Sequence, residues 1–143
     1  MPGPEPGETV HATCVARNGR GLLILGASGR GKSSLALQLI AFGAELVADD
    51  RTELRLNGGR VFAHCSATLT GMIEARGVGL LSVPNCAEAE IVLVVDLDRE
   101  ESERLPPFRQ IQIMGQSLNL VLQSQNDHFP AAVWLYLSQG RKG

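Results

Sequence analysis

Short apolar runs separated by turn residues dominate this sequence, and most of them have the length of a strand. The most apolar run, residues 91–96, has the form of a buried strand that ends in an acid. Two turn sequences that favour hairpins, Asn18-Gly19-Arg20-Gly21 and Asn57-Gly58-Gly59, each join neighbouring runs. The pattern therefore predicts a sheet that contains antiparallel hairpins. The predicted strands are residues 11–17, 21–25, 45–48, 52–56, 60–63, 80–83, 91–96 and 109–114.

Helical patterns are fewer than strand patterns. Residues 32–41 predict an α-helix because they contain neither Gly nor Pro, and Gly43 then ends it. Weaker patterns predict a helical turn within residues 68–75 and a helix over residues 117–125. The tryptophan-containing run 131–137 fits either a core helix or an interface patch.

The composition is that of one globular domain, because 143 residues with 44% hydrophobic residues suit a single core. The 13 basic and 15 acidic residues give a net charge of −2, and no basic block recommends nucleic acid as a partner. The longest apolar runs fall far short of the ~20 residues that span a bilayer. We therefore expect neither a nucleic-acid partner nor a membrane span.

The first ten residues differ from the rest of the chain. Residues 1–10 carry three prolines and two glutamates but no apolar core, so they are neither a signal peptide nor an anchor. They predict a flexible N-terminal arm, and residues 11–143 predict the folded domain. The cysteines Cys14, Cys65 and Cys86 are widely separated and odd in number, which favours a reducing cytoplasm over a disulfide framework or a zinc site.

One segment carries a recognisable chemistry, because it fits the pattern G-x-x-x-x-G-K-[ST] in full. It lies between the predicted strand 21–25 and the predicted helix 32–41, as a phosphate-binding loop requires. Its backbone N–H groups would surround the phosphates of a nucleoside triphosphate, Lys32 would add a positive charge, and Ser33 would ligate magnesium. Because strands outnumber helices and hairpins flank this loop, we expect an α/β P-loop domain with a mixed sheet. The loop residues are Gly26, Ala27, Ser28, Gly29, Arg30, Gly31, Lys32 and Ser33.

Two acidic positions compete for the role of metal ligand or proton acceptor. Asp96 ends the strand 91–96, as the magnesium-binding aspartate does in common P-loop ATPases and GTPases. Asp49 and Asp50 follow the strand 45–48 and supply two carboxylates. Aspartate is also favoured at strand ends for its hydrogen bonds to backbone. These residues alone leave both positions open.

Three segments, in order and approximate spacing, resemble the catalytic domain of the HPr kinase/phosphorylase family. The first is the phosphate loop, which many families share. The second is Leu-Val-Ala-Asp-Asp-Arg at residues 46–51, and the third is Glu-Ala-Arg-Gly-Val-Gly-Leu-Leu at residues 74–81; both are more particular to this family. The resemblance covers about residues 11–104, and the family's usual N-terminal regulatory domain has no counterpart in this sequence. It implies an HPr kinase/PEP carboxykinase-like fold.

The resemblance also implies roles for the matching residues. Either aspartate of the doublet would be the general base, and we favour Asp50. The implied roles are assistance to the catalytic acid by His11, phosphate binding by Lys32, magnesium binding by Ser33 and Glu74, proton transfer by Asp49 or Asp50, and stabilisation of the transferring phosphoryl group by Arg104.

The implied activity is that of a bacterial, cytoplasmic, ATP-dependent kinase that uses magnesium and phosphorylates the phosphocarrier protein HPr on a serine. Family members form hexamers, so a homo-oligomer is also implied. Relatives carry an Arg-Pro-Gly-Arg-Asn-like segment tied to dephosphorylation, whereas residues 113–117 read Ile-Met-Gly-Gln-Ser. Without those arginines we expect weak or absent phosphorylase activity. The alternatives are a nucleotide-sensing module without phosphotransfer and a generic NTPase that uses Asp96.

Overall fold

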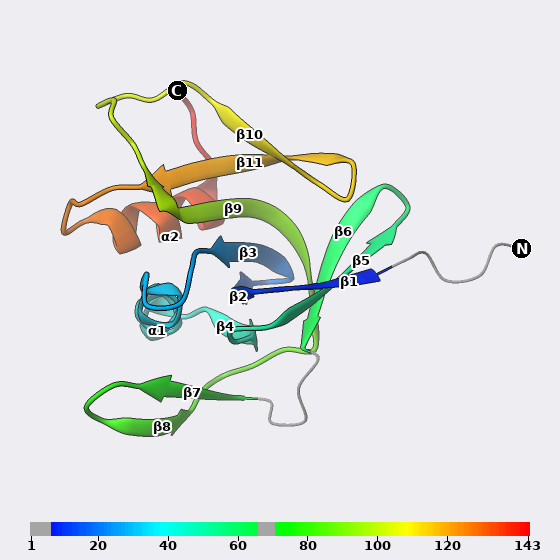
Figure 1. Ribbon diagram of the computed structural model, residues 1–143, viewed down its shortest axis with the longest axis vertical. Coiled ribbons are helices and arrows are strands. Elements are labelled where there is room, and N and C mark those ends of the chain that lie inside the picture. The colour runs from blue at the N-terminus through cyan, green and yellow to red at the C-terminus, as the bar shows by residue number, and fades with distance from the viewer. Residues whose placement is uncertain (1–6, 66–70) are drawn as a thin grey trace, which may run out of the picture.

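A curled mixed sheet with two helices on one face forms the protein, as the computed structural model shows for residues 7–65 and 71–143 (Figure 1). The order in the sheet is β1-β5-β6-β9-β3-β2-β4, with β11 also paired to β9 and β10 paired to β11. The strands are β1 (Gly7–Val10), β2 (Ala12–Arg17), β3 (Arg20–Leu25), β4 (Glu45–Ala48), β5 (Thr52–Asn57), β6 (Arg60–Cys65), β7 (Met72–Ala75), β8 (Gly79–Ser82), β9 (Glu88–Glu100), β10 (Arg109–Ile113) and β11 (Gln116–Gln123). The helices are α1 (Lys32–Phe42) and α2 (Phe129–Gln139).

The long strand β9 organises the sheet. Its first residues pair antiparallel with β6, and the rest of the strand pairs in parallel with β3 on one side and β11 on the other. The carboxyl ends of these three parallel strands therefore meet at one edge of the sheet. Ligands of α/β sheets bind at such an edge, which is where the phosphate loop follows β3.

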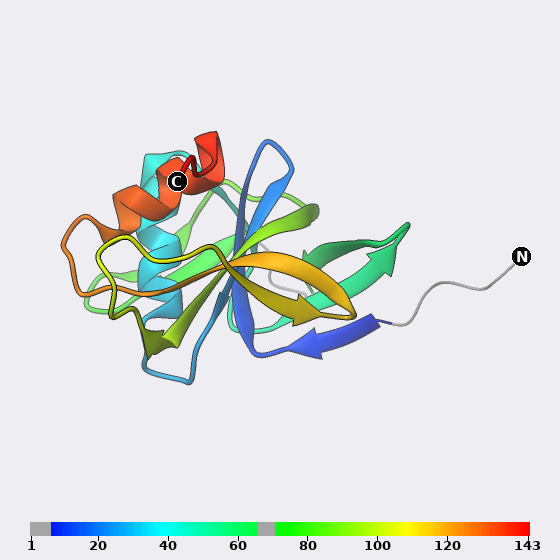
Figure 2. The ribbon, with the colours of Figure 1, turned by 90° about the horizontal axis from the view of Figure 1, so that it is seen from above.

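Period-two alternation along the central strands gives the sheet two buried faces. Leu22 and Ile24 of β3 point into a core that α1 and α2 cover, whereas Leu23 points into a second core on the other face. The helices contact each other over the first core, and Figure 2 shows them side by side on that face. Neither helix in the described part of the chain is long and apolar enough to cross a membrane.

The two helices also meet at the single tryptophan of the chain. The Trp134 ring lies 6.3 Å from the Phe42 ring between centroids, and the Arg17 guanidinium lies 5.0 Å from its centroid. Val133 and Leu137 on the same helix are buried. Of the two interpretations left open for residues 131–137, the core helix is therefore the observed one.

The local predictions that depended on turns are confirmed. Both hairpins form, and Asn18 and Gly19 have the positive φ values (51° and 79°) that a two-residue hairpin turn needs. The helix predicted over residues 32–41 extends to Phe42, and Gly43 ends it. The mixed α/β sheet with more strands than helices is also confirmed.

Three local predictions are wrong. Residues 116–123 form a strand instead of a helix, because the turn at Met114 and Gly115 (φ 51° and 79°) folds them back onto β10 and their leucines alternate. Residues 72–75 form β7 instead of a helical turn, since buried Ile73 and Ala75 alternate with exposed Glu74; residues 66–70 lie outside the described residues. Residues 7–10 are not an arm but pair with β5, through backbone bonds that side-chain composition does not reveal.

Replacing the buried Leu93 of β9 by Ala should lower the free energy of unfolding by about 3 kcal/mol, because the side chain is 1% exposed and its loss leaves a cavity. Leu105→Ala, at a side chain that is 80% exposed, is the matched control and should change stability by less than about 0.5 kcal/mol. Urea unfolding of both variants measures the difference. Equal effects would contradict the assignment of β9 to the core.

Candidate active site

The phosphate loop is shaped by glycine and by the strand beside it. Between the end of β3 and the start of α1, Gly31 adopts φ 97° as the residue that precedes the helix. A Cβ on Gly26 would lie 3.2 Å from the Leu97 Cβ of β9, so only glycine fits there without a shift. Among the described residues no side chain caps α1, and its first N–H groups are left for an anion.

Lys32 is held inside the loop rather than extended into water. Its side chain is 6% exposed, and its ammonium donates to the carbonyl of Gly26 (2.8 Å) and more weakly to that of Ala27 (3.5 Å). A buried ammonium next to the start of a helix that no described side chain caps makes a positive site, which favours an anion. The arrangement suits the β and γ phosphates of a nucleotide.

A buried threonine bonds to both residues of the aspartate doublet. Strands β2 and β4 are neighbours, which brings Thr13 beside the residues that follow β4. The Thr13 hydroxyl donates to Asp49 Oδ1 (3.0 Å) and accepts the backbone N–H of Asp50 (3.1 Å). Both aspartates are thus positioned by a side chain 36 residues or more away in sequence.

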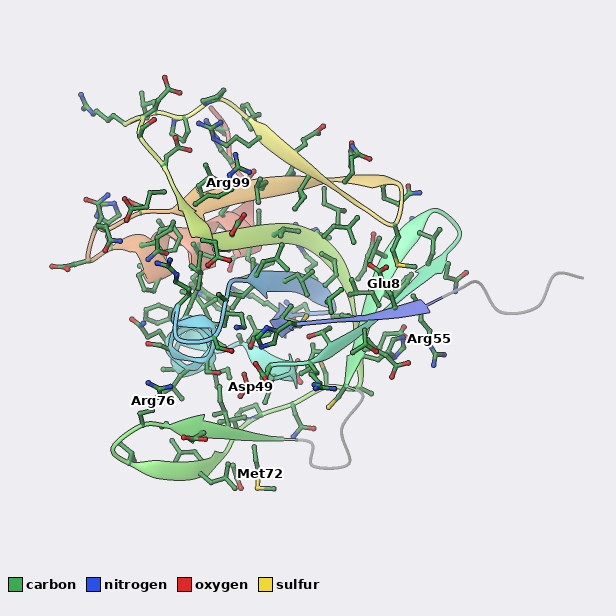
Figure 3. The ribbon with its side chains drawn as sticks, viewed as in Figure 1. Glu8, Asp49, Arg55, Met72, Arg76 and Arg99 are labelled. Atoms are coloured by element: carbon green, nitrogen blue, oxygen red, sulfur yellow. The ribbon has the colours of Figure 1, made fainter. Side chains whose placement is uncertain are left out.

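Asp49 is joined to the phosphate loop directly. The Ser33 hydroxyl, one residue into α1, donates to Asp49 Oδ1 at 2.8 Å, and Figure 3 shows Asp49 next to α1. A hydroxyl and a carboxylate oxygen side by side are hard oxygen donors, which magnesium prefers. No group of three or more His, Cys, Asp or Glu side chains that could hold a metal occurs in residues 7–65 and 71–143. Ser33 and Asp49 could hold a magnesium ion only together with further ligands from phosphate and water.

Asp50 faces the solvent and contacts a histidine. His11 Nε2 lies 2.6 Å from Asp50 Oδ1, with side chains 47% and 64% exposed. Within the described residues the second carboxylate oxygen of Asp50 has no hydrogen-bond partner, so an incoming hydroxyl can reach it. Asp50 also has φ 66°, an unusual value for a non-glycine residue and one that is often found at functional sites.

Three residues proposed from sequence form no hydrogen bond to this cluster within the described part of the chain. Glu74 lies on β7 with an exposed side chain. Arg104 is exposed in the loop that follows β9, where it lines a cavity of about 680 Å³ between that loop, β11 and α2. Asp96 lies beside Leu25 in the sheet, and its Oδ1 accepts the backbone N–H of Asp98 (2.9 Å).

Two arginines fix the loop that contains Arg104. Arg109 donates to both carboxylate oxygens of Glu101, each at 2.8 Å, and this bidentate contact lowers the pKa of Glu101 to about 2. The same contact raises the pKa of Arg109. Arg141 donates to the carbonyls of Pro106 and Pro107, and it stacks on Phe108 with its guanidinium 4.1 Å from the ring centroid.

Sequence reasoning did not find two residues that touch the cluster. Thr13 interrupts the apolar strand β2 with a fully buried hydroxyl, a signal that was present in the sequence. Asp98, which accepts the backbone N–H of Ala27, lies two residues beyond Asp96, the acid that ends the apolar run. Its contact spans 71 residues and has no local sequence signature.

Comparison with known proteins bears on the same segments. The profile of the family described as "HPr Serine kinase C-terminal domain" matches residues 5–120. The HPr kinase/phosphorylase of Bordetella petrii is 41% identical over 113 residues, which are 71% of this chain and 37% of that protein. The HPr kinase/phosphorylase of Cupriavidus necator is 37% identical over 128 residues, 81% of this chain and 40% of that protein. The chain thus spans about two fifths of the length of these curated relatives.

A solved structure gives the same fold. The Hpr(Ser) kinase/phosphatase from Coxiella burnetii superposes with a TM-score of 0.75 and 24% sequence identity. The match covers 92% of this chain and 88% of that one. This similarity is evidence for the fold, including the mixed sheet around the phosphate loop.

The bond between Glu101 and Arg109 should make stability depend on acid pH. The folded-state pKa of about 2 lies below the ordinary value of 4.5, so the stabilisation is complete above pH 4.5 and is lost as the pH falls towards 2. Urea unfolding of the wild type and of Glu101→Gln, at neutral pH and near pH 2, measures this. We expect the stability difference between them to shrink in acid. A difference that is the same at both pH values would contradict the role of the ionised pair.

Proposed function

The chain belongs to the HPr serine kinase C-terminal domain family, and on this premise we propose that it is a magnesium-dependent kinase that transfers the γ-phosphoryl group of ATP to a serine of HPr. In this proposal residues 11–143, together with the strand β1 that pairs with them, form the catalytic domain. It works as a cytoplasmic, homo-oligomeric bacterial enzyme with the phosphocarrier HPr as its protein partner.

One observation carries the proposal: the hydrogen bond from Ser33 to Asp49 joins the phosphate loop to the aspartate doublet. A module that only senses a nucleotide needs the loop but has no need of a solvent-facing carboxylate next to it. Here Asp50 adjoins Asp49, whose carboxylate accepts the Ser33 hydroxyl of the loop, and Asp50 keeps an oxygen open to solvent. That pairing is what phosphoryl transfer to a hydroxyl requires.

The proposed reaction divides the work among these residues. Backbone N–H groups at the start of α1 and the Lys32 ammonium bind the β and γ phosphates, after Lys32 exchanges the Gly26 carbonyl for phosphate oxygen. Ser33 and Asp49 would hold magnesium, which would neutralise phosphate charge as the transition state forms.

The acceptor serine is activated on the other side of the doublet. Asp50 accepts the proton of the serine hydroxyl as the new bond from serine oxygen to phosphorus forms and the bond to the leaving ADP oxygen breaks. His11 binds the other Asp50 oxygen and holds the carboxylate towards the acceptor. This division assigns the base to Asp50 and the metal to Asp49.

Two further roles rest on the family resemblance. Glu74 is proposed as a second magnesium ligand, and Arg104 as a cation that stabilises charge on the transferring phosphoryl group. The generic NTPase that uses Asp96 is disfavoured because Asp49, and not Asp96, bonds to Ser33 of the phosphate loop in the described part of the chain.

Asp50→Asn should lower the rate of serine phosphorylation on HPr by 10²-fold or more, on the order expected for loss of a general base. ATP binding should change little, because the loop remains intact. Asp96→Asn is the matched control and should keep the rate within about threefold. The measurement is mass spectrometry of HPr incubated with ATP, magnesium and purified protein.

Two results would contradict the proposal. ATP binding by the wild type with no phosphate on HPr would support a nucleotide sensor. Loss of ATP turnover in Asp96→Asn together with normal turnover in Asp50→Asn would support the generic NTPase.

Phosphorylase activity should be weak, because the turn between β10 and β11 offers Met114 and Gly115 and no arginine to hold phosphate. With phosphoserine-HPr and inorganic phosphate as substrates, we expect dephosphorylation at least tenfold slower than the kinase reaction under the same conditions. Comparable forward and reverse rates would refute this expectation.

A further inference from the structure

Asp98, near the end of β9, binds the beginning of the phosphate loop. The backbone N–H of Ala27 lies 3.1 Å from each of the two Asp98 carboxylate oxygens, and Arg30 Nε lies 3.4 Å from Oδ1. Both partners belong to the loop, whereas Asp98 belongs to the neighbouring parallel strand. The contact therefore fixes the loop to the sheet from outside the loop.

The N–H that Asp98 binds belongs to the same peptide unit as the carbonyl that binds Lys32. The Ala27 N–H and the Gly26 carbonyl are the two polar ends of one planar peptide group. Asp98 accepts from the N–H end, and the Lys32 ammonium donates to the carbonyl end at 2.8 Å. A rotation of this peptide would break both bonds, so Asp98 sets the direction of the carbonyl that holds Lys32.

Asp98 is itself well placed for this role. Its backbone N–H donates to Asp96 Oδ1 (2.9 Å), and the preceding Leu97 lies against Gly26, as the Cβ distance above shows. Strand β9 also pairs with β3 up to Leu25, the last residue before the loop. The backbone that carries the Asp98 carboxylate is therefore fixed next to the phosphate loop.

The hydrogen bond contributes more than the ion pair. The side chains of Asp98 and Arg30 are 43% and 61% exposed, so water and salt screen their attraction. The bond from a backbone N–H to a carboxylate is charge-assisted and directional. An asparagine at this position would keep an acceptor oxygen for the same N–H and lose only the charge.

We propose that Asp98 is a positioning residue of the nucleotide site, which holds the Gly26–Ala27 peptide so that the loop and Lys32 are ready for the β phosphate. This inference rests on the proposed function, because it assumes that the loop binds a nucleotide. It adds to the site a residue outside both the phosphate loop and the aspartate doublet.

The test compares ADP binding by isothermal titration calorimetry in the wild type, Asp98→Ala, Asp98→Asn and Asp127→Ala. Asp127 is an exposed aspartate outside the site and is the matched control. We expect the Kd for ADP to rise about tenfold in Asp98→Ala, because one charge-assisted hydrogen bond is lost. Asp98→Asn and Asp127→Ala should stay within about threefold of the wild type. The thermal midpoint of the nucleotide-free Asp98→Ala protein should fall by no more than about 5 °C, so that the variant is still folded in the binding assay, which separates positioning from loss of folding.

Other results of this titration would contradict either the nucleotide site or the role of Asp98. A wild type that does not bind ADP would overturn the nucleotide site and this inference with it. A wild type that binds ADP, with an unchanged or lower Kd in Asp98→Ala, would overturn the role of Asp98 alone. A tenfold loss in Asp98→Asn would show that charge, and not the bond to the peptide, matters, and would also refute the inference. Should Asp98→Ala not fold, the asparagine variant still provides this last comparison.

Discussion

The parallel pairing of β3 with β9 is the constraint on which the rest of the structure depends. It places Leu25 beside Asp96 and brings the two strand ends to one edge, so that the loop after β3 turns against β9. Leu97 then fills the space beside Gly26, and the loop bends over it. The same two strands divide the apolar side chains between a core under the helices and a core on the opposite face. Fold and candidate site therefore share one element of backbone.

A second layer of polar contacts builds the candidate site on this scaffold. Thr13, buried in β2, bonds to both residues of the aspartate doublet, and Ser33 bonds to the first of them. A buried hydroxyl without partners would be costly, so the three groups hold one another in register. The outcome is an asymmetric pair in which Asp49 faces the loop and Asp50 faces the solvent.

The features that could be predicted from sequence are those with a local cause. The phosphate loop, its helix and both hairpins follow from glycine positions and short apolar runs. The sequence predicts a helix where β11 forms, because the pairing of β11 with β9 is not visible in the local pattern. It does not predict β1, because an edge strand is held mainly by backbone hydrogen bonds. The contacts of Thr13 and Asp98 span 36 and 71 residues, and only the folded sheet brings such groups together. The residues alone indicate both Asp96 and the aspartate doublet, and the family resemblance favours the doublet, whereas the supporting side chains are recognised only in the folded structure.

The tryptophan at the contact between the helices has an optical consequence. Trp134 is the only indole in the chain, and it lies against Phe42 at the carboxyl end of α1, beneath the guanidinium of Arg17. The amino end of that helix is the phosphate loop, so a rigid rod of 11 residues joins the loop to the fluorophore. Displacement of α1 would alter the polarity and the quenching around this one indole. The fluorescence of Trp134 would therefore report a movement of the phosphate loop without an attached dye.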